Sequence, residues 1–341
     1  MNLPDYQFIS APLWLVTVLH LLTLSLHFMA MNFLLGGVII TLLSNARKRW
    51  DDATAVKFAR LFPAATAATV TLGVAPLLFL QLVYPRQVYA AAIVSGWFWL
   101  GVPAAVIVAY YALYRASFAG QRTGRAGKAV LLLALAGLLY VSLVYSSVFS
   151  MAEQPGLIRD LYARDQSGFV WNPAVGDYAL RWLHMVFGAL TVGGFFVGLL
   201  GRNDVEVFAT GKRFFVGGMV AAALVGMAYL LALQEHLLAL MRSPAIWALT
   251  ASVLLSLVSL HFFFKKNFWL SGIMLFLSLA GMVFVRHTVR LLRLAGEFDL
   301  ASWRVAPQWS PFAMFLACFV VMLVVVAWML RMFFGAKKSA A

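Results

Sequence analysis

Apolar stretches of about twenty or more residues recur along the whole chain, separated by short polar connections. Segments this long and uniformly apolar predict membrane-spanning helices, because barrel strands are shorter and alternate between apolar and polar residues. The pattern predicts an all-α, polytopic bundle of about nine helices. They lie near residues 13–43, 62–84, 90–114, 128–150, 178–200, 214–239, 245–264, 268–290 and 311–335. No internal repeat or linker is evident, so we expect a single transmembrane domain over residues 1–341.

Composition and charge support a membrane protein and predict its orientation. Hydrophobic residues make up 63% of the chain and charged residues 11%, with a mean hydropathy of +0.90. The net charge of +14 does not indicate nucleic-acid binding, because the basic residues lie in the connections between helices. Alternate connections and their flanks hold 17 of the 26 Lys and Arg residues, including all eight lysines. By the positive-inside rule, these connections face the cytoplasm, as does the carboxyl terminus. The amino terminus is then outside, and a bacterial inner membrane is expected.

Cysteine usage excludes two kinds of site. Cys318 is the only cysteine, so the chain has no internal disulfide and no cysteine metal site of its own. The sequence also lacks Cys-x-x-Cys-His, which excludes covalently attached haem.

Histidines at the helix ends are the candidate chemistry, since ionisable residues at membrane depth are costly. The predicted helix directions place five of the six in the outer half: His20, His27, His184, His236 and His287. His20 and His27 are seven residues apart, and seven residues of helix turn by about 700°, so these two histidines share one face of the helix. Imidazole is the usual membrane-buried ligand of haem iron. The five therefore predict two or three haem b groups, with His184, His27 and His287 as iron ligands.

Arginines lie close to these histidines in the sequence. Arg181 precedes His184 by one turn, Arg286 adjoins His287, and Arg290 follows it. We expect these arginines to hold the haem propionates. The alternative for any one histidine is a hydrogen bond between helices.

Four segments resemble the large, haem-bearing subunit of the cytochrome bd quinol oxidases. The first segment is Leu26-His27-Phe28 followed by Leu35-Gly36-Gly37, and the second runs from Gly73 to Gln81. The third is Asn172-Pro173 followed by Leu183-His184 and Gly193, and the fourth runs from Gly281 to His287. The resemblance implies nine helices with the amino terminus outside and a low-spin haem b on His184. His287 lies one position beyond a haem-ligating glutamate of that family.

The chain departs from that family at the positions that serve oxygen reduction. Residues 90–114 contain no acid, the outer quinol loop is reduced to about residues 236–244, and Gly-Arg-Gln-Pro-Trp is missing after the eighth helix. Ser252 stands where the family has its methionine ligand. Met241, His236 and Met314 are the candidates to replace it. The resemblance therefore implies a divergent member that lacks the oxidase carboxylates.

These features predict an electron-transfer subunit of a quinone-linked respiratory complex. It would pass electrons between membrane quinone or quinol and a periplasmic c-type or multihaem cytochrome. Two alternatives remain open: a terminal reductase of oxygen or nitric oxide with an open haem, and a haem-free membrane anchor. The quinone-site candidates are Glu235, His236, Arg242 and residues 151–177.

Overall fold

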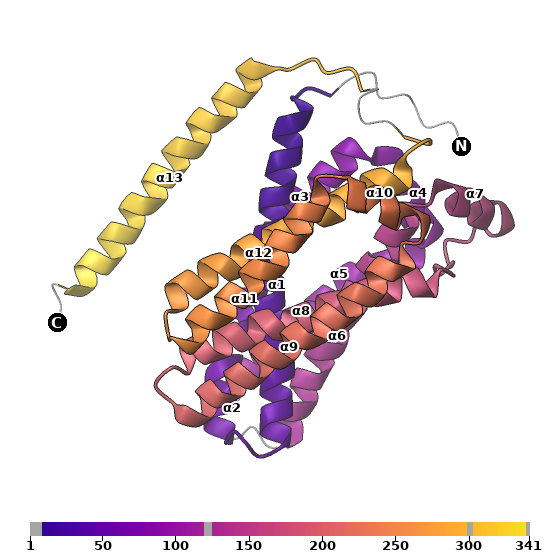
Figure 1. Ribbon diagram of the computed structural model, residues 1–341. Helices are drawn as coiled ribbons and strands as arrows, with labels where there is room; N and C mark the ends of the chain where they lie inside the picture. Colours follow the sequence, from indigo (N-terminus) through magenta and orange to yellow (C-terminus); the bar gives the residue numbers. More distant parts are fainter. Residues whose placement is uncertain (1–8, 119–124, 299–302, 339–341) are drawn as a thin grey trace. The chain divides into compact units, whose positions relative to one another are not determined.

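The computed structural model describes residues 9–118, 125–298 and 303–338, which form helices and connections without a named strand. The helices are α1 (Leu13–Ala46), α2 (Asp52–Ala59), α3 (Phe62–Val83), α4 (Pro85–Val94), α5 (Gly96–Phe118), α6 (Arg125–Met151), α7 (Pro155–Arg164), α8 (Val175–Leu200), α9 (Val205–Ala232), α10 (Glu235–Arg242), α11 (Ala245–Phe264), α12 (Phe268–Leu294) and α13 (Trp309–Lys338). The predicted all-α class is confirmed (Figure 1).

Nine spans in the described ranges are long and apolar enough to cross a membrane. They correspond one for one to the nine predicted helices, with α2 and α3 counted as one span. The chain is therefore a multi-pass membrane protein.

Two predicted helices are each interrupted in the structure. The helix predicted over 90–114 is divided at Ser95, whose hydroxyl donates to the carbonyl of Val170 at 2.8 Å instead of facing lipid. The helix predicted over 214–239 ends at Ala232, and Gln234 follows with a φ of 49°. A non-glycine residue in this left-handed region cannot continue an α-helix. The short helices α4 and α10 result from these breaks.

Polar caps fix several of the helix starts. Asp51 accepts from the backbone N–H of Thr54 before α2, and Asp204 accepts from those of Glu206 and Val207 before α9. Such caps satisfy N–H groups that have no partner inside the helix. Short aspartate side chains therefore order the two cationic connections that precede α2 and α9.

The structure contains two compact units, which we describe separately. One lies within Met1–Val18 and Leu300–Ala341, where Ile9 donates to the carbonyl of Arg304 at 2.8 Å ahead of α13. The other lies within Leu19–Asp299 and holds most of the chain. The prediction of a single membrane domain stays a prediction.

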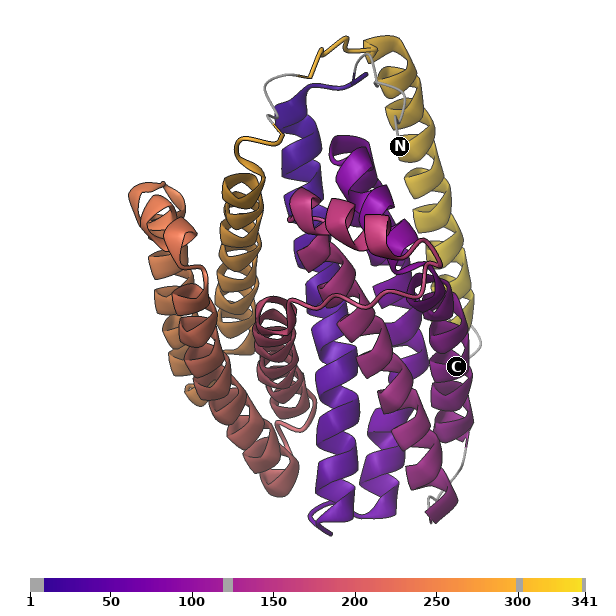
Figure 2. The same ribbon diagram turned by 90° about the vertical axis from the view of Figure 1, so that its right-hand side faces the viewer.

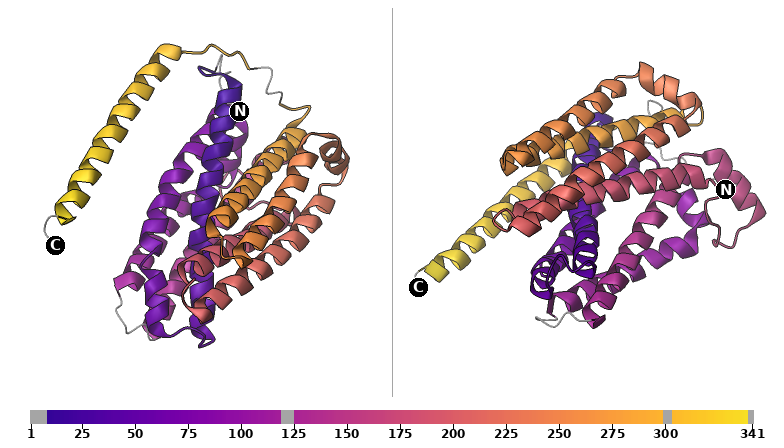
Figure 3. Two further views of the ribbon diagram at one scale, coloured as in Figure 1. Left: turned by 60° about the vertical axis from the view of Figure 1, so that its left-hand side comes forward. Right: turned by 60° about the horizontal axis from the view of Figure 1, so that its bottom comes forward.

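Within the larger unit the spanning helices form two groups. Figure 2 shows the helices of residues 19–151 (indigo to magenta) beside those of residues 175–294 (rose to orange). The antiparallel pairs α8–α9 and α11–α12 are clear from both directions in Figure 3. Each group has four spanning helices and one short helix after its second span, α4 in the first and α10 in the second.

Candidate functional site: two histidine sites and an arginine cluster

His27 on α1 faces the neighbouring helix α3. Its Nδ1 lies 2.9 Å from the backbone carbonyl of Thr69. One turn later α3 has Gly73, where an added Cβ would lie 2.8 Å from His27 Cε1. The glycine therefore provides the space that the imidazole occupies. A proton on Nδ1, shared with the carbonyl, leaves the Nε2 lone pair for another partner.

His184 on α8 has the same surroundings on α9. Its Nδ1 lies 2.8 Å from the carbonyl of Ala222. A Cβ added to Gly226 would lie 2.9 Å from His184 Cε1. As at His27, the acceptor carbonyl precedes the glycine by four residues. Both imidazoles are half-buried.

These two sites belong to a repeated helix pair. In each pair, a Gly-Gly begins nine residues after the histidine: Gly36-Gly37 and Gly193-Gly194. The second glycine contacts a buried phenylalanine, Phe62 on α3 or Phe215 on α9. The residue whose carbonyl faces the histidine, Thr69 or Ala222, follows its phenylalanine by seven residues. The glycine that faces the imidazole follows the same phenylalanine by eleven residues. No repeat was predicted from the sequence, and the structure corrects this expectation.

The two histidines lie at about the same depth. Three spanning helices separate α1 from α8, so both cross in the same direction. The two helices meet at Gly36 and Gly193, where a Cβ on Gly193 would lie 2.8 Å from the Gly36 Cα. Each histidine precedes that contact by nine residues, or about 13 Å of helix. The two Nε2 positions therefore belong to one layer of the bundle.

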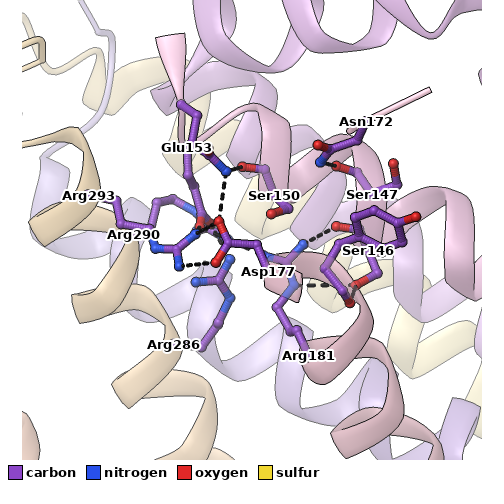
Figure 4. Close-up of polar contacts among 12 residues, drawn as sticks. Ser146, Ser147, Ser150, Glu153, Asn172, Asp177, Arg181, Arg286, Arg290 and Arg293 are labelled. Carbon is purple, nitrogen blue, oxygen red and sulfur yellow. Dashed lines mark hydrogen bonds and ion pairs between the residues drawn. The ribbon is translucent and has the colours of Figure 1, made fainter. Parts of the chain in front are cut away.

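A third feature is the arginine cluster, which we define as Arg181 on α8 and Arg286, Arg290 and Arg293 on α12, gathered around Glu153 (Figure 4). Arg286 Nη2 donates to Glu153 Oε1, and Arg290 Nε lies 3.4 Å from the same oxygen. Arg181 and Arg293 lie 3.7 and 3.9 Å from Oε2. The Glu153 side chain is 1% exposed. The connection that follows α6 thus supplies the central carboxylate, and the second group of helices supplies all four cations.

Asp177 at the start of α8 extends this network. Its carboxylate accepts from both Nη atoms of Arg293, at 2.9 and 3.2 Å, and from Gln154 Nε2 at 3.0 Å. Four guanidinium groups face two carboxylates, which leaves an excess of two positive charges. Burial by itself would raise the pKa of the Glu153 carboxyl, but Arg286, Arg181 and Arg290 outweigh it and lower the pKa to about 2. Glu153 is therefore ionised at neutral pH.

His20 and His287 lie beside this cluster and are buried, at 5% and 8% exposure. His287 and Arg290 are both within electrostatic range of His20, and the backbone of Pro76 faces its ring. Neither ring nitrogen of His20, nor Nδ1 of His287, has a hydrogen-bond partner among the described residues. Buried polar atoms of this kind need an explanation, such as a bound group.

The other candidates lie on the short helix α10 or in the other compact unit. His236 and Met241 are on α10, where the Met241 side chain is 55% exposed. Met314 is exposed on α13, in the other compact unit. Arg242 is exposed at the end of α10, and the Glu235 side chain lies outside the described part. The second ligand expected from Met241, His236 or Met314 stays a prediction.

Sequence reasoning missed Glu153 as the centre of the cluster. It was included only within the candidate segment 151–177, because its burial depends on how the chain after α6 packs against α8 and α12. The spacing of Arg286, Arg290 and Arg293 along one helix face was the available signal, since three cations on one buried face require an anion.

The residues fit haem in two respects. Haem-ligating histidines commonly donate Nδ1–H to a carbonyl, which orients the ring and presents Nε2 to the metal. His27 and His184 have this arrangement, and the cluster has a surplus of guanidinium donors for carboxylates.

Compared with protein-family models and with curated proteins, the chain matches none of them.

Proposed function

We propose that this chain is a b-type cytochrome subunit of a respiratory complex. It transfers electrons between membrane quinone or quinol and a c-type or multihaem cytochrome on the outer face. Its own role is electron transfer within a quinone-linked oxidoreductase complex.

The repeated histidine geometry carries this proposal. A histidine that served only to bind two helices together would need no second copy with the same acceptor carbonyl, the same facing glycine and the same spacing. Two presented Nε2 atoms in one layer of the bundle are what two haem groups would require.

The cluster supports the same proposal through charge. One haem carries two propionates, and the excess of two positive charges around Glu153 matches one such group in number. Arg286 Nη1 is buried without a hydrogen-bond partner among the described residues, so it is the donor we assign to a propionate. His20 and His287 beside them are the candidate ligands of a third haem. When bound, haem supplies one-electron redox chemistry.

The predicted sidedness of the chain supports electron transfer at the outer face. The charge pattern predicts that both histidine sites and the cluster lie in the outer half of the bundle, where we expect a periplasmic cytochrome to dock. Because His27 and His184 share one depth, electrons between them move along the membrane plane.

An absorption spectrum of the purified protein tests the proposal. We expect reduced-minus-oxidised bands of haem b, reducible by a quinol analogue, and extractable non-covalent haem. Variant His261→Ala is the control, because that exposed histidine at the end of α11 lies away from both sites. A folded, haem-free preparation would refute the proposal and favour the membrane-anchor alternative.

One observation favours a second candidate function. Each repeat presents a single oriented histidine, and the Met241 side chain on α10 is exposed. An iron with one protein ligand keeps an open position, which suits a terminal reductase of oxygen or nitric oxide. Carbon monoxide discriminates the two candidates: a shifted spectrum of the reduced protein indicates an open iron, and an unchanged one indicates a six-coordinate electron carrier.

A further inference from the structure

A small polar cavity lies where α3, α4 and α12 meet the end of α6. It is lined by Leu80, Tyr84, Gln87, Val88, Phe149, Ala152, Glu153, Arg290 and Leu294. The centre of a water-sized sphere has about 10 Å³ in which to move. Five of the nine lining residues are apolar, and the other four carry polar side-chain groups.

Four residues of this wall carry a buried polar atom that makes no hydrogen bond to another described residue: Tyr84 Oη, Gln87 Oε1, Glu153 Oε2 and Arg290 Nη1. Glu153 Oε2 has only the longer ion pairs with Arg181 and Arg293, at 3.7 and 3.9 Å. A buried polar atom without a hydrogen bond is costly, so four such atoms on residues around one cavity require a shared explanation.

The donor and acceptor types of these atoms are complementary. Arg290 Nη1 can only donate, and the Glu153 carboxylate and Gln87 Oε1 can only accept. The Tyr84 hydroxyl can donate, and its pKa is raised by burial, so it keeps its proton at neutral pH. The set therefore comprises two donors and two acceptors.

The volume and the charge then select the occupant. About 10 Å³ is the space that one water requires, and it is far too small for a quinone head group. A chloride ion is disfavoured, because two of the four atoms are acceptors and one belongs to a carboxylate. A water molecule has two hydrogens to donate and two lone pairs to accept with.

We propose that one ordered water occupies this cavity, donates to Gln87 Oε1 and Glu153 Oε2, and accepts from Tyr84 Oη and Arg290 Nη1. The water connects α3 and α4 of the first group of helices with α12 of the second. It also positions the Arg290 guanidinium, which lies 5.6 Å from the centre of the Tyr84 ring and next to His20 and His287. This inference does not depend on the protein binding haem.

The sign of a stability change tests it. Removing a hydroxyl that has no partner stabilises a protein, whereas removing one that binds water destabilises it. With the water present, Tyr84→Phe and Gln87→Met each lower the melting temperature of the detergent-solubilised chain by about 2 °C or more. Tyr89→Phe, at a tyrosine that is 43% exposed, is the control and leaves it unchanged.

A cryo-electron microscopy map at water-resolving resolution provides the second readout. The expected result is one peak about 3 Å from all four atoms, absent in Gln87→Met. An unfilled cavity, a peak of chloride size, or a raised melting temperature in Tyr84→Phe would each overturn the proposal.

Discussion

The two histidine sites have the same geometry although their helices pack differently. On the second pair, the helix backbones touch: a Cβ on Gly194 would lie 2.3 Å from the backbone nitrogen of Phe215. On the first pair, the Phe62 ring stands between the helices at the equivalent glycine, Gly37. The distance from histidine to carbonyl is nevertheless 2.9 Å at His27 and 2.8 Å at His184. The carbonyl and the facing glycine are what the two sites keep in common.

The sites also differ seven residues before each histidine. The first pair has His20 there, and the second has Asp177, which binds Arg293. All four arginines of the cluster belong to the second group of helices. The difference indicates that the repeat provides two similar sites, whereas the positive charges of the arginine cluster come from the second group only.

The largest expected effect comes from removing the carboxylate that joins the two groups. Glu153→Gln leaves the buried Arg290 and three half-buried arginines around a neutral side chain, and removing one partner of a buried ion pair costs about 3–5 kcal/mol. The measurement is the denaturant-induced unfolding of the detergent-solubilised chain. Glu297→Gln is the control, because its ion pair with Arg159 is exposed and contributes little to stability. Equal losses in both variants would contradict the account.

The pH dependence of stability follows from the same residue. The pKa of Glu153 is lowered from 4.5 to about 2, so its stabilisation is complete above pH 4.5 and is lost as the pH falls toward 2. The loss amounts to roughly 3 kcal/mol. The difference in melting temperature between the wild type and Glu153→Gln should be constant from pH 8 to 5.5 and should shrink below pH 4.5. A difference that shrinks mainly above pH 5.5 would show that Glu153 is not the group responsible.

Next in size are substitutions at the glycines that face the histidines. Gly73→Ala and Gly226→Ala each displace one imidazole, so each should lower the bound haem by about one equivalent of the two. Gly217→Ala on the same helix as Gly226 meets nothing within 4 Å and is the control. Haem content is measured on the folded fraction by its absorbance after extraction. Full haem content in both Gly73→Ala and Gly226→Ala would contradict the proposed geometry.

The smallest expected effect is at Thr69, whose backbone carbonyl, not its side chain, accepts from His27. Thr69→Ala makes the first pair like the second, which already has Ala222 at that place. We expect unchanged haem content and an unchanged spectrum. A loss of haem would show that the threonine hydroxyl, which donates to the Ala65 carbonyl, takes part in holding the site.

The sequence predicted the helices but not the repeat. Apolar length alone determines which segments span a membrane, so all nine predicted spans appear. The breaks at Ser95 and Gln234 depend on a distant carbonyl and a backbone angle, which an apolar run does not reveal. The repeat was missed because few positions agree between the pairs. The connection from the second glycine to the phenylalanine also differs, 25 residues in the first pair and 21 in the second.

The haem content of the two histidine variants tests the central claim most directly. Wild-type protein and the variants His27→Ala, His184→Ala and His27→Ala/His184→Ala should be purified together, with His261→Ala as the control. The account predicts that each single variant loses one haem, that the losses add in the double variant, and that His261→Ala loses none. Wild-type haem content in the double variant would contradict it.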